Sequence, residues 1–424
     1  MNVLVVGSGG REHAIAWRLR QSPRVTRLWC APGNAGIASV AECVPLKAED
    51  IHGLAQFAAT NAVDLTVVGS EGPLVKGIAD LFEERGLALF GPSQAAARVE
   101  GSKKFLKEFL QRHRIPTAAY RSFGPSEYGE AQAYVRSVPG PYVIKSDGLA
   151  AGKGVVIAGS TAEALSALKE YFEAKVFGDA GTTVVIEEFM TGEEASLFVL
   201  CDGDRYVVLP AAQDHKRIGD GDTGKNTGGM GAYAPAPVVT PDILERVERE
   251  IVRPTLAGMR AEGHPYKGCL YVGLMITPQG PKVVEYNCRL GDPETQAVMP
   301  LIESDPFELF DACARGTLAS YELRVRSQTA VCVVVASKGY PDAYETGRPV
   351  NGLDDAERRG ALVFHAGTKR EGERLLTAGG RVFGVTALGN GLPDAIAKAY
   401  EGVSCVSFDG AYSRTDIGRK GLPR

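Results

Sequence analysis

The chain has 424 residues and a net charge of -4, and its composition is that of an ordinary globular protein, 44% hydrophobic and 23% charged. At roughly 100–200 residues per domain, this length predicts two to four domains with cores that need no disulfide or structural metal. The sequence has no long basic or acidic run, which argues against a nucleic-acid groove or a polybasic membrane patch. It also lacks an apolar run of roughly 18 residues, so no membrane span is expected.

The N-terminal residues and the cysteines bear on the compartment. The first residues are apolar but lack the basic region and cleavage site of a signal peptide. The eight cysteines are scattered and form no C-x-x-C pair. We therefore expect free thiols in a reducing compartment, the cytoplasm, and neither disulfides nor a zinc site.

Residues 1–102 alternate short apolar runs with helical patterns, which predicts a doubly wound βαβ domain. The expected strands are Val3–Val6, Leu28–Ala31, Leu65–Val68 and Leu87–Phe90, and the expected helices are Arg11–Gln21, Ile51–Thr60 and Leu74–Glu84. In such sheets ligands bind at the carboxyl ends of the strands. Three glycine-containing loops follow strands here: 7–10, 32–34 and 69–73.

The rest of the chain predicts an α+β unit followed by a small β-rich unit, because short hairpin loops join many of its strands. The expected helices are Ser102–Gln111, Thr161–Tyr171 and Asp394–Tyr400. The expected strands are Tyr142–Lys145, Val155–Ala158, Val184–Phe189, Leu197–Asp202, Tyr206–Ala211, Cys269–Ile276, Lys282–Asn287, Ala330–Ala336, Ala361–Ala366 and Arg381–Leu388.

The first glycine loop, Gly7-x-Gly9-Gly10-x-Glu12, follows a strand and opens a helix, a position that suits a phosphate. A dinucleotide fingerprint would need a third glycine in place of Glu12 and an acidic residue at the end of the second strand. That strand ends Cys30-Ala31-Pro32. A nicotinamide cofactor is therefore disfavoured, while a tight turn without a ligand stays open.

The second glycine loop, Lys145 to Gly154, resembles a P-loop but has one residue too few and a strand after it instead of a helix. A glycine-rich loop between two strands is a hairpin flap, which can place backbone N–H groups and Lys153 over phosphates. The alternative is a mobile surface hairpin with solvated lysines. Further along, the apolar strand ending at Phe189 could offer an adenine slot, with Glu194 placed for the ribose, although an edge strand looks the same.

The run from Lys282 to Gln296 carries the clearest chemistry. Glu285 and Asn287 share one face of a strand, roughly 7 Å apart, and can grip magnesium that also holds phosphates. Arg289 follows, where it could stabilise a transferring phosphoryl group. The alternative is a charged turn. A long polar loop, Gln213 to Tyr233, is interpreted as a substrate-positioning loop.

With these residues, the chain resembles the glycinamide ribonucleotide synthetase family of ATP-grasp enzymes over essentially its whole length. The matching segments are Gly7–His13, Pro32–Gly36, Gly69–Gly77, Gly101–Lys103, Lys145–Gly154, Glu187–Ser196, Gln213–Tyr233, Glu285–Gln296, Phe364–Thr368 and Arg414–Gly418. The resemblance implies a pre-ATP-grasp domain (1–102), an ATP-grasp domain (103–327) with a flap subdomain at about 122–190, and a β-rich C-terminal domain (328–424).

The resemblance also implies a reaction. ATP phosphorylates glycine to glycyl phosphate, and the amine of 5-phosphoribosylamine attacks it, giving glycinamide ribonucleotide, ADP and phosphate. Such chemistry needs positioning and charge neutralisation and no nucleophilic side chain. The expected cofactors are ATP and Mg²⁺ or Mn²⁺. The expected partners are these small molecules, without nucleic acid or membrane. Oligomeric state is left open, with a monomer as the working expectation.

The residue roles that the resemblance implies fall into four sets. The metal would be held by Glu285 and Asn287, and catalysis would use Asp214, Lys216 and Arg289. ATP would be held by Lys103, Lys145, Gly152, Lys153, Gly154, Glu187, Glu188, Phe189, Met190 and Glu194. The two other substrates would contact Gly9, Gly10, Gly33, Asn34, Glu71, Lys76, Asp292, Glu294 and Thr295.

One departure and three alternatives stay open. Many ATP-grasp enzymes carry another metal-binding acid on the preceding strand, which here reads Tyr271 to Met275 without one, so the number of metals is in doubt. The nearest alternative is an ATP-grasp enzyme acting on another carboxylate, such as a carboxylase that uses bicarbonate. The others are a nicotinamide oxidoreductase and a catalytically silent nucleotide sensor.

Overall fold

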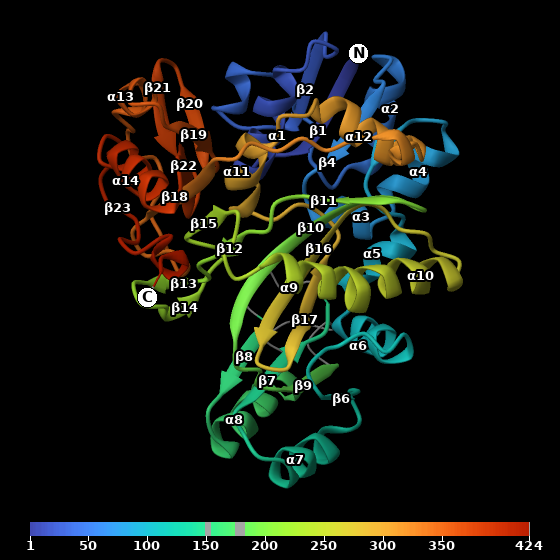
Figure 1. The fold of residues 1–424 in the computed structure, drawn as a ribbon. Helices are drawn as coiled ribbons and strands as arrows, with labels where there is room; N and C mark the ends of the chain where they lie inside the picture. Colours follow the sequence, from blue (N-terminus) through green and yellow to red (C-terminus); the bar gives the residue numbers. More distant parts are fainter. Residues whose placement is uncertain (149–153, 174–182, 424) are drawn as a thin grey trace.

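The computed structural model describes residues 1–148, 154–173 and 183–423. Figure 1 shows the N-terminal and C-terminal units side by side. The central unit extends away from them and ends in a small separate sheet. The sequence predicts this multidomain α/β and α+β architecture correctly.

The N-terminal unit is built on a parallel sheet with strand order β3-β2-β1-β4-β5. Its central strands are buried nearly throughout, as expected where both faces are covered. The strands are β1 (Asn2–Gly7), β2 (Arg27–Pro32), β3 (Glu42–Cys43), β4 (Leu65–Val68) and β5 (Leu89–Phe90). The helices are α1 (Gly10–Arg20), α2 (Ile51–Thr60), α3 (Glu71–Val75), α4 (Ile78–Glu84) and α5 (Gln94–Gly101).

One expected helix of this unit, Leu74–Glu84, is wrong in its continuity. The chain forms α3 and α4 instead, with a break at Gly77, whose φ of +86° lies in the left-handed region. Glycine adopts that conformation at little cost, and it ends a helix readily.

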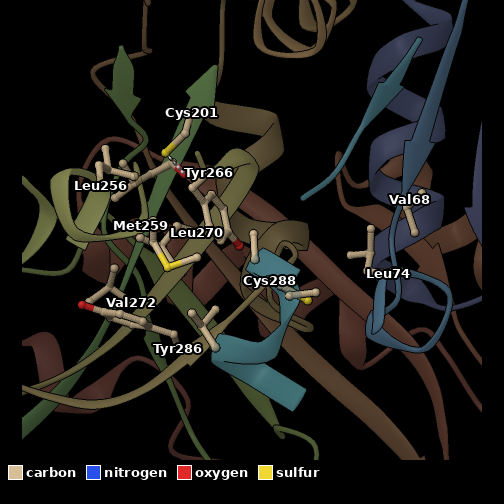
Figure 2. Packing of buried hydrophobic residues seen from close by; sticks show 14 of the residues in the cluster. Val68, Leu74, Cys201, Leu256, Met259, Tyr266, Leu270, Val272, Tyr286 and Cys288 are labelled. Atoms are coloured by element: carbon tan, nitrogen blue, oxygen red, sulfur yellow. Dashed lines mark hydrogen bonds between the residues drawn. The ribbon is translucent and has the colours of Figure 1, made fainter. Parts of the chain in front are cut away.

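The central unit contains an antiparallel sheet with strand order β11-β10-β16-β17. These strands are β10 (Glu193–Asp202), β11 (Tyr206–Val208), β16 (Lys267–Thr277) and β17 (Gly280–Asn287), and the helices are α6 (Lys103–Arg112), α9 (Pro241–Val247) and α10 (Arg253–Ala261). Figure 2 shows how α10 side chains Leu256 and Met259 pack with Leu270, Val272 and Tyr286 of this sheet. This packing buries one face of β16 and β17 against α10.

The small sheet at the far end has strand order β6-β9-β7-β8 and its own apolar core. Ser160 caps α8 by accepting a hydrogen bond from Glu163 N. The elements are β6 (Tyr120–Phe123), α7 (Tyr128–Ser137), β7 (Tyr142–Ser146), β8 (Val155–Ala158), α8 (Thr161–Phe172) and β9 (Val184–Glu188). This sheet covers most of the range, about 122–190, in which a flap subdomain is expected.

The C-terminal sheet, of strand order β12-β15-β18-β22-β19, recruits residues from far upstream. Its strands are β12 (Gln213–Asp214), β15 (Gly231–Ala234), β18 (Thr329–Ser337), β19 (Leu362–His365) and β22 (Arg381–Gly389), with β23 (Ala411–Tyr412) also pairing to β18. β12 and β15 come from the long loop inside the range expected for the central domain. The remaining elements are β13 (Arg217–Gly219), β14 (Thr223–Asn226), α11 (Glu294–Val298), α12 (Pro306–Arg315), α13 (Leu353–Arg358), β20 (Thr368–Glu371), β21 (Arg374–Thr377) and α14 (Leu392–Val403).

All eight cysteines are unpaired, as expected. Among the described residues, no helix combines the length and apolar character that crossing a membrane requires.

Candidate active site

Glu285 and Asn287 lie on one face near the end of β17. Glu285 is opposite Gly273 of β16, and Asn287 is opposite Tyr271. The intervening Tyr286 is buried against the core on the other face. The expected alternation is therefore present, and both oxygen-bearing side chains remain accessible.

Cationic side chains surround the Glu285 carboxylate. Lys216 Nζ lies 3.7 Å from Glu285 Oε1. Burial alone would raise the pKa of this carboxyl group, but nearby cations outweigh it and lower that pKa below its ordinary value; in order of effect they are Lys216, Lys145, Lys103 and Arg289. Four cationic side chains therefore act on the end of β17, an arrangement that suits a polyanion such as a triphosphate.

Two buried lysines share the Glu187 carboxylate of β9. Lys107 Nζ lies 3.0 Å from one Glu187 oxygen, and Lys145 Nζ lies 2.9 Å from the other. Lys145 also donates to the Val284 carbonyl of β17 at 3.3 Å. Burial lowers the pKa of Lys107 to about 8, with Glu187 opposing the shift. Glu187 therefore holds Lys145 beside the strand that carries Glu285.

The glycine-rich loop meets the same region through Lys103, at the start of α6. Lys103 Nζ donates to the Gly148 carbonyl at 2.7 Å. Gly154, on the far side of the loop, accepts from Ser146 N at 2.9 Å, so β7 and β8 stay paired at the loop's base. The predicted ATP contacts Gly152 and Lys153 lie outside the described residues.

Three predicted ATP contacts, Glu188, Phe189 and Met190, lie at the end of β9 and directly after it. Phe189 is 42% exposed, which is high for a large apolar residue. Glu188 pairs with Lys282 of β17 at 3.3 Å, and the half-buried Met190 follows. Across the same gap, Glu194 of β10 is half-exposed and pairs with Lys216.

Asp214, the last residue of β12, and Lys216, two residues further on, line a pocket beside β10 and β16. Lys216 Nζ bridges Glu194, at 3.1 Å, and Glu285. Glu194 is the main cause that raises the pKa of Lys216. Burial, with the neighbouring Glu294, raises the pKa of Asp214. The pocket lining is Glu194, Ala195, Ser196, Asp214, Lys216, Tyr271, Gly273, Leu274 and Val284.

Glu294 and Thr295 begin α11 and are both buried. Glu294 Oε1 accepts hydrogen bonds from Ser196 Oγ at 3.1 Å and from Tyr271 OH at 3.0 Å. Thr295 donates its hydroxyl to the Gly291 carbonyl at 2.5 Å. Glu294 thus lies behind the pocket, whereas the Thr295 hydroxyl is engaged with the backbone.

Arg289 is held from the N-terminal unit. It lies 3.0 Å from Glu100 of α5 and 3.3 Å from Glu71 of α3. Its burial would lower the pKa, but Glu100 and Glu71 outweigh it, so the pKa is raised. Arg289 Nη2 also approaches Asn287 Oδ1, at 3.4 Å. Glu71, predicted to bind substrate, is therefore already an ion-pair partner of Arg289.

The first glycine loop packs against the run after β17. A Cβ on Gly10 would come within 2.6 Å of Gln296 Nε2, and a Cβ on Gly9 within 3.2 Å of Asp292 Oδ2. Asp292 accepts from Gln296 Nε2 at 2.7 Å and pairs with Arg381 at 3.5 Å. Glycine allows this close approach, which brings Gly9, Gly10 and Asp292 together.

The other predicted residues of the N-terminal cradle are occupied by protein contacts. Asn34 Nδ2 donates to the carbonyls of Ser8 and His365, both at 2.8 Å. Gly33 has a φ of +72°, and a Cβ there would lie 2.5 Å from Cys43 Sγ. Lys76 forms an exposed ion pair with Glu49 at 2.6 Å. Asn34 and Gly33 therefore shape the loop.

Comparison with known proteins decides the family. Models of phosphoribosylglycinamide synthetase match three parts of the chain: the N domain at residues 1–100, the ATP-grasp (A) domain at 101–295 and the C domain at 330–420. The chain belongs to the phosphoribosylglycinamide synthetase family.

Relatives of this family match along the full length. The chain is 52% identical over 428 residues to a phosphoribosylamine–glycine ligase of Chlorobaculum tepidum, with both chains fully covered. It is also 52% identical to the Vibrio vulnificus ligase, covering 100% of this chain and 99% of the relative. The solved Thermotoga maritima phosphoribosylamine–glycine ligase is 34% identical, with a TM-score of 0.84 and coverage of 98% and 100%.

More distant structures share the phosphoribosylglycinamide synthetase fold. The biotin carboxylase domain of a 2-oxoglutarate carboxylase from Hydrogenobacter thermophilus has a TM-score of 0.71 at 15% identity, covering 97% of this chain and 91% of that one. This likeness shows the ATP-grasp fold alone.

Several residues at this synthetase-family site were not predicted from sequence: Glu100, Lys107, Ser196, Tyr271 and Arg381. Arg381 donates to the carbonyls of Gly228, at 2.6 Å, and Asp292, at 2.7 Å. Each of the five acts through a contact with a residue distant in the chain. No local pattern could have identified them, although buried charges such as Glu100 become conspicuous once burial is known.

Proposed function

We propose that this chain uses ATP to join glycine to 5-phosphoribosylamine, giving glycinamide ribonucleotide, ADP and phosphate. Family membership and full-length relatives named phosphoribosylamine–glycine ligase support this reaction. The observation that carries it is the ring of cations around Glu285 at the end of β17. Such a ring matches a triphosphate transferring its terminal phosphoryl group.

The chemistry follows from the substrates. The glycine carboxylate is a poor electrophile, so an oxygen of it attacks the terminal phosphorus of ATP, giving glycyl phosphate and ADP. The sugar amine then attacks the acyl carbon, phosphate leaves, and the nitrogen loses a proton. We assign Asp214 to accept that proton, because its raised pKa makes the ionised carboxylate a better base. Lys216 and Arg289 neutralise charge on the phosphoryl group.

We assign the divalent metal to Glu285 and Asn287, with Mg²⁺ or Mn²⁺ as the ion. Both residues offer hard oxygen ligands from one strand face. Among the described residues, no group of three or more His, Cys, Asp and Glu side chains could hold a metal. Phosphate oxygens would therefore complete the coordination, as such ions commonly require. The bound ion would neutralise phosphate charge.

The remaining assignments are part of the same proposal. The flap and the end of β9 would hold ATP, with Phe189 against the adenine, and Gly9, Gly10 and Asp292 would line the phosphoribosylamine site. We keep the domain boundaries 1–102, 103–327 and 328–424, with the β12–β15 hairpin added to the C-terminal sheet. A monomer in the cytoplasm is proposed, the compartment because every cysteine is free.

ADP release tests this function directly. The assay contains magnesium, ATP, glycine and phosphoribosylamine formed in place from ribose 5-phosphate and ammonia, and each component is omitted in turn. We expect ADP release that requires both glycine and the sugar amine. Release supported by bicarbonate without glycine would instead indicate a carboxylase of the same fold, and nucleotide binding without turnover would indicate a sensor.

A further inference from the structure

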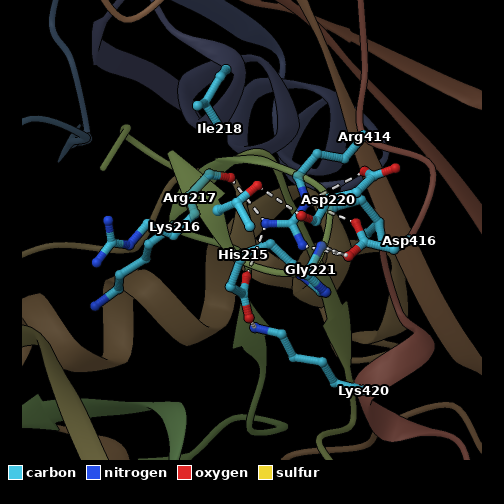
Figure 3. Close-up of polar contacts among 12 residues, drawn as sticks. His215, Lys216, Arg217, Ile218, Asp220, Gly221, Arg414, Asp416 and Lys420 are labelled. Carbon is cyan, nitrogen blue, oxygen red and sulfur yellow. Dashed lines mark hydrogen bonds and ion pairs between the residues drawn. The ribbon is translucent and has the colours of Figure 1, made fainter. Parts of the chain in front are cut away.

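The C-terminal segment Tyr412–Lys420 packs along the turn that follows Lys216. Its Arg414–Gly418 run belongs to the sequence resemblance, yet the proposed function gives it no role. Figure 3 shows Arg414 and Asp416 facing Asp220 and Gly221 in this turn. The two segments lie about 195 residues apart in the chain.

Arg414 is the centre of the contact, and its side chain is fully buried. It makes a two-pronged bond to both Asp416 oxygens, each at 2.7 Å. From the turn, the Arg217 carbonyl and Asp222 Oδ1 accept from Arg414 Nη1, both at 2.9 Å. A planar guanidinium meets this fixed set of acceptors in a way that an ammonium group cannot.

Neighbouring residues close the contact on both sides. Asp416 Oδ2 accepts from Gly221 N at 2.8 Å. Thr415 N donates to Asp220 Oδ1 at 2.9 Å. Lys420 Nζ lies 2.6 Å from Asp222. The turn is therefore fixed by backbone and side-chain bonds from the C-terminal segment.

The extended segment just before this turn, His215 and Lys216, reaches the active site on its other side. His215 Nε2 accepts from Gly418 N at 3.4 Å, toward the C-terminal segment. The next residue, Lys216, points the opposite way to Glu194 and Glu285, as alternation along an extended chain requires. Within the described residues, none of the bonds given for Arg414 or Asp416 reaches Glu194 or Glu285.

We propose that Arg414 and Asp416 are positioning residues, which fix the turn after Lys216 and so hold Lys216 at the distance that catalysis requires. The inference rests on the proposed function, in which Lys216 acts on the phosphoryl group. A misplacement of about 1 Å can cost roughly 100-fold in rate, so a remote buried guanidinium can control kcat without touching a substrate.

The test variant is Arg414→Lys, because Ala would remove a fully buried side chain together with the cation that Asp416 pairs with, and could unfold the protein. In the ADP-release assay we expect kcat to fall roughly 10- to 100-fold, with the KM for ATP changing less. The matched control is Arg358→Lys, which alters the exposed Arg358–Asp355 pair of α13 and should keep wild-type kcat. Unfolding is followed for each variant, and kcat is measured well below its transition.

A double-mutant cycle with Lys216→Met separates positioning from stability. If Arg414 acts through Lys216, the Arg414→Lys change lowers kcat in wild type but adds no further loss in the Lys216→Met background. Losses that multiply, or an Arg414→Lys variant that unfolds earlier yet keeps kcat within twofold, would overturn the inference.

The two proposals can fail separately. A wild-type enzyme that releases ADP without needing glycine refutes the proposed function, whereas the cycle can still be measured on that ADP release. A glycine-dependent wild type whose Arg414→Lys variant matches Arg358→Lys refutes the positioning role and leaves the ligase standing.

Discussion

Glu285, near the end of β17, has two proposed roles. It balances the charge of nearby cations, and it offers a hard oxygen ligand to the metal. Glu285→Gln keeps the side-chain shape but removes the charge, so turnover should fall by roughly 100-fold or more and the magnesium concentration for half-maximal rate should rise. ADP release over a magnesium titration measures both. The exposed Glu371→Gln serves as control, and wild-type turnover of Glu285→Gln at ordinary magnesium would refute the metal assignment.

Asp214 makes folding stability depend on pH in the opposite direction to most paired carboxylates, whose pKa values are lowered by folding. Burial and Glu294 raise its pKa in the folded protein, so the folded state holds this proton more tightly than the unfolded state. Stability from this group is present below its unfolded pKa and is lost as the pH rises through the folded pKa.

The Asp214→Asn variant cannot ionise at this position, so it does not lose this stability as the pH rises. We expect the variant to be inactive, and its free energy of unfolding relative to wild type should improve as the pH rises from 5 to 8. Urea unfolding across this range measures the difference, and the exposed Asp242→Asn of α9 should show no such trend. A pH-independent difference for Asp214→Asn would contradict the prediction.

Some site residues could be placed from the sequence, and others depend on contacts that only the folded chain makes. Glu285 and Asn287 could be placed together because strand alternation depends only on spacing. Asn34 and Thr295 were expected to contact substrates only because the chain resembles the family, and spacing could not reveal their partners in the protein. Their polar groups bond to the protein backbone, and those partners are set by the folded positions of His365 and α11.

At the scale of elements, Glu187 ties the flap strands to α6. Lys107, Lys145 and Glu187 are all buried. Glu187→Gln would leave two buried ammonium groups without their counter-charge, at a cost of roughly 3–5 kcal/mol in the free energy of unfolding. Urea unfolding of this variant, compared with the exposed Glu130→Gln of α7, measures the cost. Equal stability of the two variants would show that the lysines do not depend on Glu187.

Strands and helices with a strong period were predictable, and α2 was predicted with both ends correct. The short β3 was missed because two residues carry no period. The helices α5, α7, α9, α10, α11, α12 and α13 were also missed. The pairing of β12 and β15 with β18 was also missed. Strand pairing between distant segments is a tertiary choice that no local window contains.

At the scale of the whole molecule, His13 of α1 and His365 of β19 join the N-terminal and C-terminal units. His13 Nδ1 accepts from His365 N at 2.8 Å. Burial, aided by repulsion from His365, lowers the pKa of His13 to about 3. The folded protein thus keeps His13 neutral, and its stability contribution is lost as the pH falls below the unfolded value near 6.5.

At pH 5 this loss amounts to about 2 kcal/mol relative to pH 8. His13→Gln keeps an acceptor and cannot titrate, so its free energy of unfolding should depend on pH less steeply than that of wild type. Urea unfolding at pH 8 and pH 5 measures the change, with the exposed His52→Gln of α2 as control. An unchanged pH dependence in His13→Gln would rule out this source of acid sensitivity.

The strand that bears Asp214, β12, pairs with β15, and β15 pairs on its other side with β18, at Gly231 opposite Val333. The turn after Lys216 is closed by Arg414. On the ribosome, the flap and the central sheet can therefore emerge while β15 still lacks β18 and the turn still lacks Arg414. A nascent or prematurely terminated chain could present a nucleotide site without an ordered Lys216. Competence for the ligase reaction is thus tied to the synthesis of β18 and Arg414, which follow the central sheet in the chain.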